Sequence, residues 1–139
     1  MEIIANAVQT VLANQNVYFT DTVACGGCSI MHRDDSGLVS LRGATSQCRA
    51  RYRVTFGGNV AVPTGGTVGP VSFAIAVDGE AVPYSTMIVT PAAVEEYSNI
   101  KSTIIVDVPR GCCYTVSVKN IGTDSANIQN ANLIVERIA

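Results

Sequence analysis

The sequence predicts an all-β protein built as an antiparallel sandwich of two layers. Short apolar runs alternate with polar positions at the period of two that is typical of strands, and clusters of turn-forming residues separate them. No long stretch shows helical periodicity. Only 14% of the residues are charged while 47% are hydrophobic, so a single copy has few ions with which to cover its surface. These observations favour one charge-poor β domain that hides part of its exterior against identical copies.

The predicted strands follow from alternation within each segment. In residues 49–56 apolar side chains alternate mainly with arginines, as in a strand between a core and a polar surface. Residues 71–77 alternate apolar with small side chains, so a close neighbour is expected over their second face. Asp78 and Gly79 come next and predict a two-residue hairpin turn. Further strands are predicted at 16–20, 28–32, 38–42, 84–90, 102–108, 112–118 and 132–138.

Between these segments lie clusters rich in Gly, Pro, Asn, Asp and Ser, which predict turns. They are residues 34–37, 57–59, 63–70, 109–111 and 120–127. Only residues 91–100 favour a helical turn, because Pro91 suits the first position of a helix.

Charge and hydropathy exclude several classes of function. The formal net charge is −2 and the isoelectric point is near 5.2, so there is no overall basic footprint for nucleic acid. The first residues lack a basic start and a continuous apolar centre, so no export signal is expected and the chain is predicted to fold in a cytoplasm. No run of 18 or more apolar residues occurs, so no membrane insertion is expected.

The five cysteines, Cys25, Cys28, Cys48, Cys112 and Cys113, cannot all pair within one chain. In a reducing compartment the expected state is free, buried thiols that pack as small hydrophobes. Oxidation after release from the cell stays open, with Cys25–Cys28 or Cys25–Cys113 as the bond. A Cys112–Cys113 bond would be strained, because adjacent α-carbons lie only about 3.8 Å apart. Alternation places Cys112 on the face of Tyr114, with Cys113 turned the other way, and leaves open which face is interior.

The residue clusters that could form a metal, redox or catalytic site match the patterns of such sites only weakly. Cys25 and Cys28 have the spacing of a zinc knuckle, with Cys112, Cys113 and His32 as further candidate ligands, but adjacent strand cysteines diverge. A redox role for the same pair would need a following helix, which is not predicted. A triad of Cys28, His32 and Asp34 would span about 20 Å along one strand. No catalytic, metal or cofactor site is therefore expected.

The carboxylate and glycine clusters are interpreted as turns and loops rather than as functional sites. Asp34–Asp35 and Glu95–Glu96 are predicted to be solvated turn residues rather than an acid and base pair. Residues 120–124 and 34–37 lack a full calcium-loop pattern. The glycine-rich stretch at 64–70 opens no helix, so phosphate binding is not expected.

The order of motifs resembles a known superfamily. The stretches "YRVTFGGNV", "GPVSFAIAVDGEAVPYSTM", "STIIVDVPRGCCYTVSVKN" and "ANLIVERI" are similar to the compact jelly-roll heads of the tumour necrosis factor and complement-head superfamily. The similarity is greatest to its bacterial and phage branch, which includes the heads of collagen-like exosporium proteins. It covers residues 16–138.

The resemblance implies a ten-stranded, two-sheet jelly roll that assembles as a homotrimer. Residues 16–139 would form the jelly-roll domain, and residues 1–15 would form an amino-terminal arm for docking or strand swapping. No Gly-X-Y tract precedes the head, so it is expected to sit directly on a surface rather than on a collagen-like stalk.

Small jelly-roll trimers of this kind resemble the auxiliary proteins that decorate phage and virus capsids. We therefore expect a non-enzymatic structural protein on the virion surface, made in the host cytoplasm, whose partner is a major capsid protein or another particle surface. The alternative is a receptor- or glycan-binding head of a surface fibre or of an exosporium protein, on a bacterial cell or spore. Its binding loops would then include 57–70 and 91–100.

Overall fold

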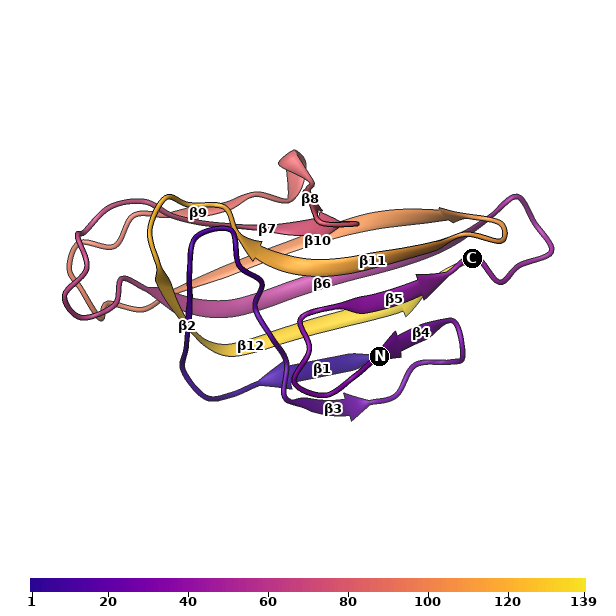
Figure 1. The fold of residues 1–139 in the computed structure, drawn as a ribbon, viewed down its shortest axis with the longest axis horizontal. Helices are drawn as coiled ribbons and strands as arrows, with labels where there is room; N and C mark the ends of the chain where they lie inside the picture. Colours follow the sequence, from indigo (N-terminus) through magenta and orange to yellow (C-terminus); the bar gives the residue numbers. More distant parts are fainter.

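The computed structural model describes residues 1–139 as a sandwich of two six-stranded antiparallel sheets (Figure 1). Its elements are β1 (Glu2–Ala5), β2 (Gln9–Val11), β3 (Asp21–Ala24), β4 (Ile30–His32), β5 (Val39–Arg42), β6 (Arg49–Ala61), β7 (Val71–Val77), β8 (Glu80–Ala81), η1 (Pro83–Ser85), β9 (Met87–Val89), β10 (Ser98–Pro109), β11 (Cys113–Asn120) and β12 (Ala126–Arg137). Sheet A has the order β10-β6-β12-β1-β3, with β2 also paired to β12. Sheet B has the order β4-β5-β11-β7-β8, with β9 also paired to β7. The predicted all-β jelly-roll sandwich is confirmed, with twelve strands instead of the ten expected.

The long strands β6, β10 and β12 form the centre of sheet A. In β6 the apolar positions are buried and the intervening side chains face outward, as the alternation predicts. The strand is longer than predicted, because Gly57, Gly58 and Asn59 continue it instead of turning. Gly57 pairs with Lys101 on one side and with Asn132 on the other. Partners on both sides override the turn preference of a Gly-Gly-Asn sequence.

The hairpin predicted after β7 is confirmed. Asp78 and Gly79 both have positive φ, 52° and 84°, as a type I′ turn requires. The Asp78 carboxylate accepts a hydrogen bond from the Thr115 amide at 2.8 Å, which ties the turn to β11. Ala74 and Ala76 on the small-residue face of β7 are fully buried, as expected for a closely packed face.

Three local predictions differ from the structure. Residues 16–20 form only two isolated bridges, Asn16 to Lys119 and Phe19 to Ser36, because this segment crosses between elements rather than lying along one strand. The segment 84–90 contains the short β9, after the 3₁₀ turn η1. No helical turn forms at 91–100. The proline-initiated turn begins at Pro83 instead.

The first fifteen residues are part of the sandwich rather than an arm outside it. Strand β1 pairs with β12 and with β3, and β2 pairs with β12. Ile3, Ala5 and Val11 are buried in the core. The domain boundary expected at residue 16 is therefore wrong for this chain, since alternating apolar residues before that position bury against the same core.

One continuous core of 29 buried side chains fills the space between the sheets. Phe19 packs edge to face against Phe56 at 6.4 Å, between a crossing segment and sheet A. Val116 and Val118 of β11 lie in the core. By alternation, the face of β11 that carries Tyr114 is therefore the interior face, a point that the sequence left open. No helix in the structure has both the length and the apolar character needed to cross a membrane.

Candidate functional site

The outer face of sheet A is formed by the outward side chains of its long central strands. Cross-strand rows run over β10, β6 and β12, such as Thr103–Thr55–Ile134. The hydroxyl groups of Thr55 and Thr103 lie 3.1 Å apart, and Ile134 is half-buried beside them. Ile105 on the next row is 44% exposed. The row of Ile105 also carries Arg53 and Glu136, so the middle of this face combines threonines and isoleucines with one ion pair. Its small and apolar side chains suit this part of the face to burial against a partner surface.

Ion pairs lie at one side of this face. Arg51 donates two hydrogen bonds to the Asp107 carboxylate, at 2.8 and 3.1 Å, and Arg49 lies 3.4 Å from the same group. Arg53 lies 3.7 Å from Glu136. The hydrogen bond from Arg51 lowers the pKa of Asp107 and raises the pKa of Arg51. The predicted arginine face is thus mostly neutralised by acids from β10 and β12.

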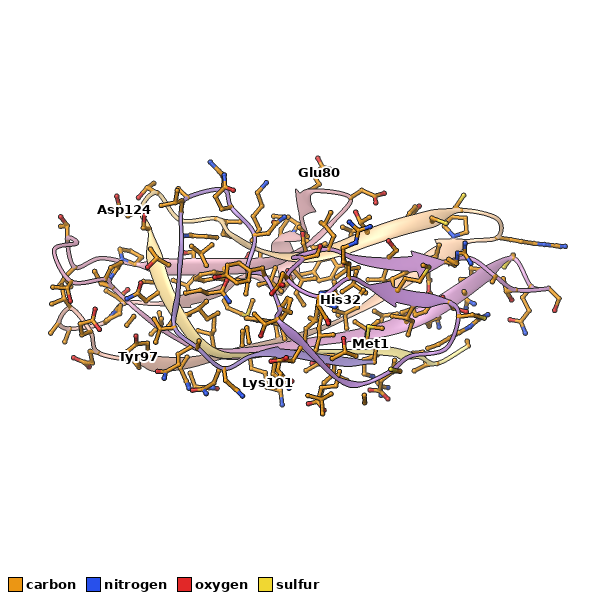
Figure 2. All side chains as sticks on the ribbon, turned by 60° about the horizontal axis from the view of Figure 1, so that its bottom comes forward. Met1, His32, Glu80, Tyr97, Lys101 and Asp124 are labelled. Atoms are coloured by element: carbon orange, nitrogen blue, oxygen red, sulfur yellow. The ribbon has the colours of Figure 1, made fainter.

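An asparagine-lined hollow of about 330 Å³ lies at the other side of the same face. The Asn99 amide donates to the Asn59 carboxamide oxygen, and the Asn59 amide donates to that of Asn130, both at 3.3 Å. Asn130 has a φ of 56° and sits where the β12 register shifts. This β-bulge, with the missing side chain of Gly57, opens the hollow in the sheet. Lys101 points outward from this layer, opposite to Glu80 on the other layer (Figure 2).

The loops nominated for recognition meet at one end of the sandwich, which we call the loop end (residues 62–70, 90–97 and 121–125). The Glu95 carboxylate accepts hydrogen bonds from the amide and the hydroxyl of Thr64, at 3.0 and 2.9 Å. A cavity of about 280 Å³ opens beside them, with Thr67, Asn120 and Asp124 in its lining. Asp124 and Tyr97 mark this end in Figure 2. Glu95 therefore holds two loops together and is more than a solvated turn residue.

All five cysteines are exposed, whereas buried thiols were expected, and none of them is bonded to another. They lie in or next to the loops β3–β4, β5–β6 and β10–β11. The expectation of buried thiols is wrong because Cys25, Cys28, Cys48 and Cys112 lie outside the strands, and Cys113 starts β11 on its outward face.

His32 does not assemble with the residues suggested for a triad. Its Nε2 donates to the Ser36 carbonyl at 3.0 Å, and its ring packs edge to face on Phe19 at 6.4 Å. The buried Nδ1 atom has no hydrogen-bond partner. The Asp34 carboxylate instead accepts from the Thr22 hydroxyl at 3.3 Å. No group of three or more His, Cys, Asp or Glu side chains converges as metal ligands do.

Comparison with known proteins supports the fold. No protein-family profile and no curated sequence matches this chain. Among solved structures it is similar to the globular domain of the zebrafish complement 1qA protein, with a TM-score of 0.64, 9% identity, and coverage of 96% of this chain and 93% of the other. It is also similar to murine APRIL, with a TM-score of 0.60, 11% identity, and coverage of 92% and 95%. The chain therefore has the jelly-roll fold of the tumour necrosis factor and complement heads.

Sequence reasoning missed two features of the site. The asparagine hollow draws side chains from β6, β10 and β12. Its signal in the sequence is the asparagine-rich run at 127–132, of which only residue 127 falls in a predicted turn and only residue 132 in a predicted strand. The Arg51–Asp107 pair joins residues 56 positions apart, which only the strand register brings together.

Proposed function

We propose that this chain is the jelly-roll head of a homotrimeric, non-enzymatic structural protein that decorates the surface of a phage or virus capsid. The observation that carries the proposal is the uncovered outer face of sheet A. Its middle carries exposed and half-buried threonines and isoleucines, and its arginines are already paired with acids of the same chain. Burying apolar surface of this kind stabilises association by about 25 cal/mol per Å².

Identical copies are the occupants that best suit this face. A chain with 14% charged residues is poorly covered by its own ions, and several large apolar side chains remain exposed. In a closed trimer each copy buries this face against a different patch of its neighbour, so all three copies hide the same surface. Three copies attached to one particle would also bind with avidity, which suits a surface-decorating protein.

Light scattering tests the assembly. The wild-type protein is expected at about three times 14.6 kDa. Ile105→Glu puts a charge in the centre of the outer face of sheet A and is expected to give monomer. Ile88→Glu is the matched control, because Ile88 is 65% exposed on the other layer. A monomeric wild-type protein, or equal loss of assembly in both variants, contradicts the proposal.

Particle decoration has its own readout. The protein is expected to copurify with assembled particles in a fixed high copy number, in contact with the major capsid protein. If the protein instead belongs to a bacterial cell or spore surface, it is expected to copurify with the cell-envelope or spore fraction.

A second candidate, recognition of a receptor or host glycan, is favoured by the loop end. Its cavity is lined by polar residues that include Thr67, Asp124 and Ser125, whose hydroxyl and carboxylate groups suit the hydroxyl groups of a sugar. Binding of immobilised glycans that is lost in Asp124→Ala, together with a low copy number on a fibre, would favour this function over decoration.

A further inference from the structure

Six of the seven arginines gather at one end of the sandwich, together with the cysteines. We call it the arginine end: the loops 25–29, 43–48 and 110–112 with the strand ends beside them. Figure 1 shows this region at the right, where β10 turns into β11 and the C-terminus lies. The arginines there are Arg42, Arg49, Arg51, Arg53, Arg110 and Arg137. Strand register brings them together, since Arg42 pairs with Cys113 and Arg49 with Pro109.

The molecule is therefore electrically polarised. The six arginines have two carboxylate side chains as partners at this end, Asp107 and Glu136, which leaves four positive side-chain charges. The remaining three cations and nine carboxylates give six negative charges elsewhere, which together reproduce the formal net charge of −2. A small negative total thus conceals a positive end, where the potential attracts acidic partners.

Two of these arginines are free to bind a partner. Arg49, Arg51 and Arg53 pair with the two carboxylates. The guanidinium of Arg137 donates to Ser29 and to the Ala139 carbonyl. Arg42 and Arg110 are exposed and make no ion pair.

The free arginines stand beside a shallow hollow of about 200 Å³, which Arg42, Gly43 and the cysteines 112 and 113 help to line. The Gly43 amide donates to the Cys112 carbonyl at 2.8 Å, and the Gly111 amide donates to the Gly43 carbonyl at 3.1 Å. A side chain at Gly43 would collide with the Pro109 carbonyl, so only glycine permits this approach. These backbone contacts hold the two loops together, and Arg42 and Arg110 lie next to the residues that make the contacts.

We propose that the arginine end docks on an acidic protein surface, with Arg42 and Arg110 as its free cations. The proposal rests on the proposed function, because a decorating protein must turn one surface toward its particle. A protein partner fits better than nucleic acid, because the strongly exposed tyrosines, Tyr18 and Tyr84, lie outside this end and Tyr114 is packed against the core. A trimer with its axis along the strands would present this end from all three copies at once.

Binding of fluorescent poly-L-glutamate, followed by anisotropy, tests the docking end. The wild-type protein is expected to bind at low ionic strength and to release the polymer as salt is added. The double variant Arg42→Gln, Arg110→Gln is expected to bind about tenfold more weakly. Bound polymer is also expected to slow alkylation of Cys112 and Cys113, which are exposed and help to line the hollow. The matched control is Lys101→Gln, Lys119→Gln, which removes the same charge away from this end and is expected to retain binding.

Several results would overturn the proposal. They are absence of polyglutamate binding, equal weakening in the control, and tighter binding of oligothymidine than of polyglutamate, which would indicate a nucleic-acid surface. Light scattering of the same samples separates this outcome from the trimer. A trimer that ignores polyglutamate refutes the docking end alone, and a monomer that binds it refutes the homotrimer alone.

Discussion

Tyr52 is the largest fully buried side chain of the protein, and its hydroxyl joins the two layers. The ring lies on β6 in sheet A, while the hydroxyl donates a hydrogen bond to the Arg42 carbonyl at the end of β5 in sheet B. A buried phenol is tolerated because its polar group finds this partner. The same bond steadies the backbone of Arg42 at the arginine end.

Tyr52→Phe is expected to lower the free energy of unfolding by about 1 kcal/mol, because the Arg42 carbonyl loses its partner while the core packing is kept. Urea denaturation measures the change. Tyr84→Phe is the control, since Tyr84 is 78% exposed and is expected to change stability very little. Equal effects in the two variants would contradict a structural role for the Tyr52 hydroxyl.

The Arg51–Asp107 pair predicts a pH dependence of stability. Its hydrogen bond lowers the pKa of Asp107 below the ordinary value of 3.8. The folded state therefore binds the proton less readily than the unfolded state, so the contribution is present above the ordinary pKa and is lost as pH falls through the lower folded value. It is small, because both side chains are solvent-exposed.

Thermal unfolding of wild type and Asp107→Asn tests this sign. The variant is expected to melt slightly lower than wild type from pH 5 to 7, and the difference is expected to shrink toward pH 3. Added salt is expected to reduce the difference at neutral pH. A gap that widens on acidification would show that the sign is wrong.

At the scale of elements, β7 has two short partners on one edge and a gap between them. It pairs with β9 at residues 71–73 and with β8 at residues 76–77. Ser85 of η1 fills the gap, where its fully buried hydroxyl accepts a hydrogen bond from the Ile75 amide at 2.9 Å and donates to the Val82 carbonyl at 2.7 Å. A single side chain thus replaces one step of the strand ladder.

Ser85→Ala is expected to lower the free energy of unfolding by about 1–3 kcal/mol, because a buried amide at Ile75 is left without an acceptor. Hydrogen exchange at the Ile75 amide is expected to become faster. Ser46→Ala in an exposed loop serves as the control and is expected to stay within about 0.5 kcal/mol of wild type. Unchanged exchange at Ile75 would refute this role.

At the scale of the whole molecule, the ends of the sandwich carry different chemistry. Exposed cysteines and free arginines lie at the arginine end, and polar loops tied by Glu95 lie at the loop end. The outer face of sheet A runs between them. One assembly can therefore use all three surfaces. The arginine end would dock, the outer face of sheet A would contact the other subunits, and the loop end would stay exposed.

Thiol titration of the native protein tests this arrangement. All five cysteines are exposed, so all five are expected to react without denaturant, at rates close to those after unfolding. A bond between Cys25 and Cys28 would leave three reactive thiols until a reductant is added. Slow reaction that denaturant accelerates would instead indicate buried thiols, as the sequence predicted.

Most strands were predictable because alternation is a property of neighbouring residues. Residues 49–56 and 71–77 show which side chains enter the core, and Asp78-Gly79 indicates a turn without knowledge of any partner. Where the prediction failed, a distant partner decided the outcome. Residues 57–59 extend β6 because β10 and β12 pair with them, and residues 1–15 join the sandwich because β12 accepts their strands.

The sequence by itself determined the fold class, the strands of the core and the low charge that favours association, since these depend on composition and local spacing. Only the tertiary structure decided that the arginines and cysteines share one end, that the asparagines of three strands line one hollow, and that Ser85 completes β7. These features depend on the register between strands far apart in the chain. Register is set by the packing of the whole core, so no single segment contains it.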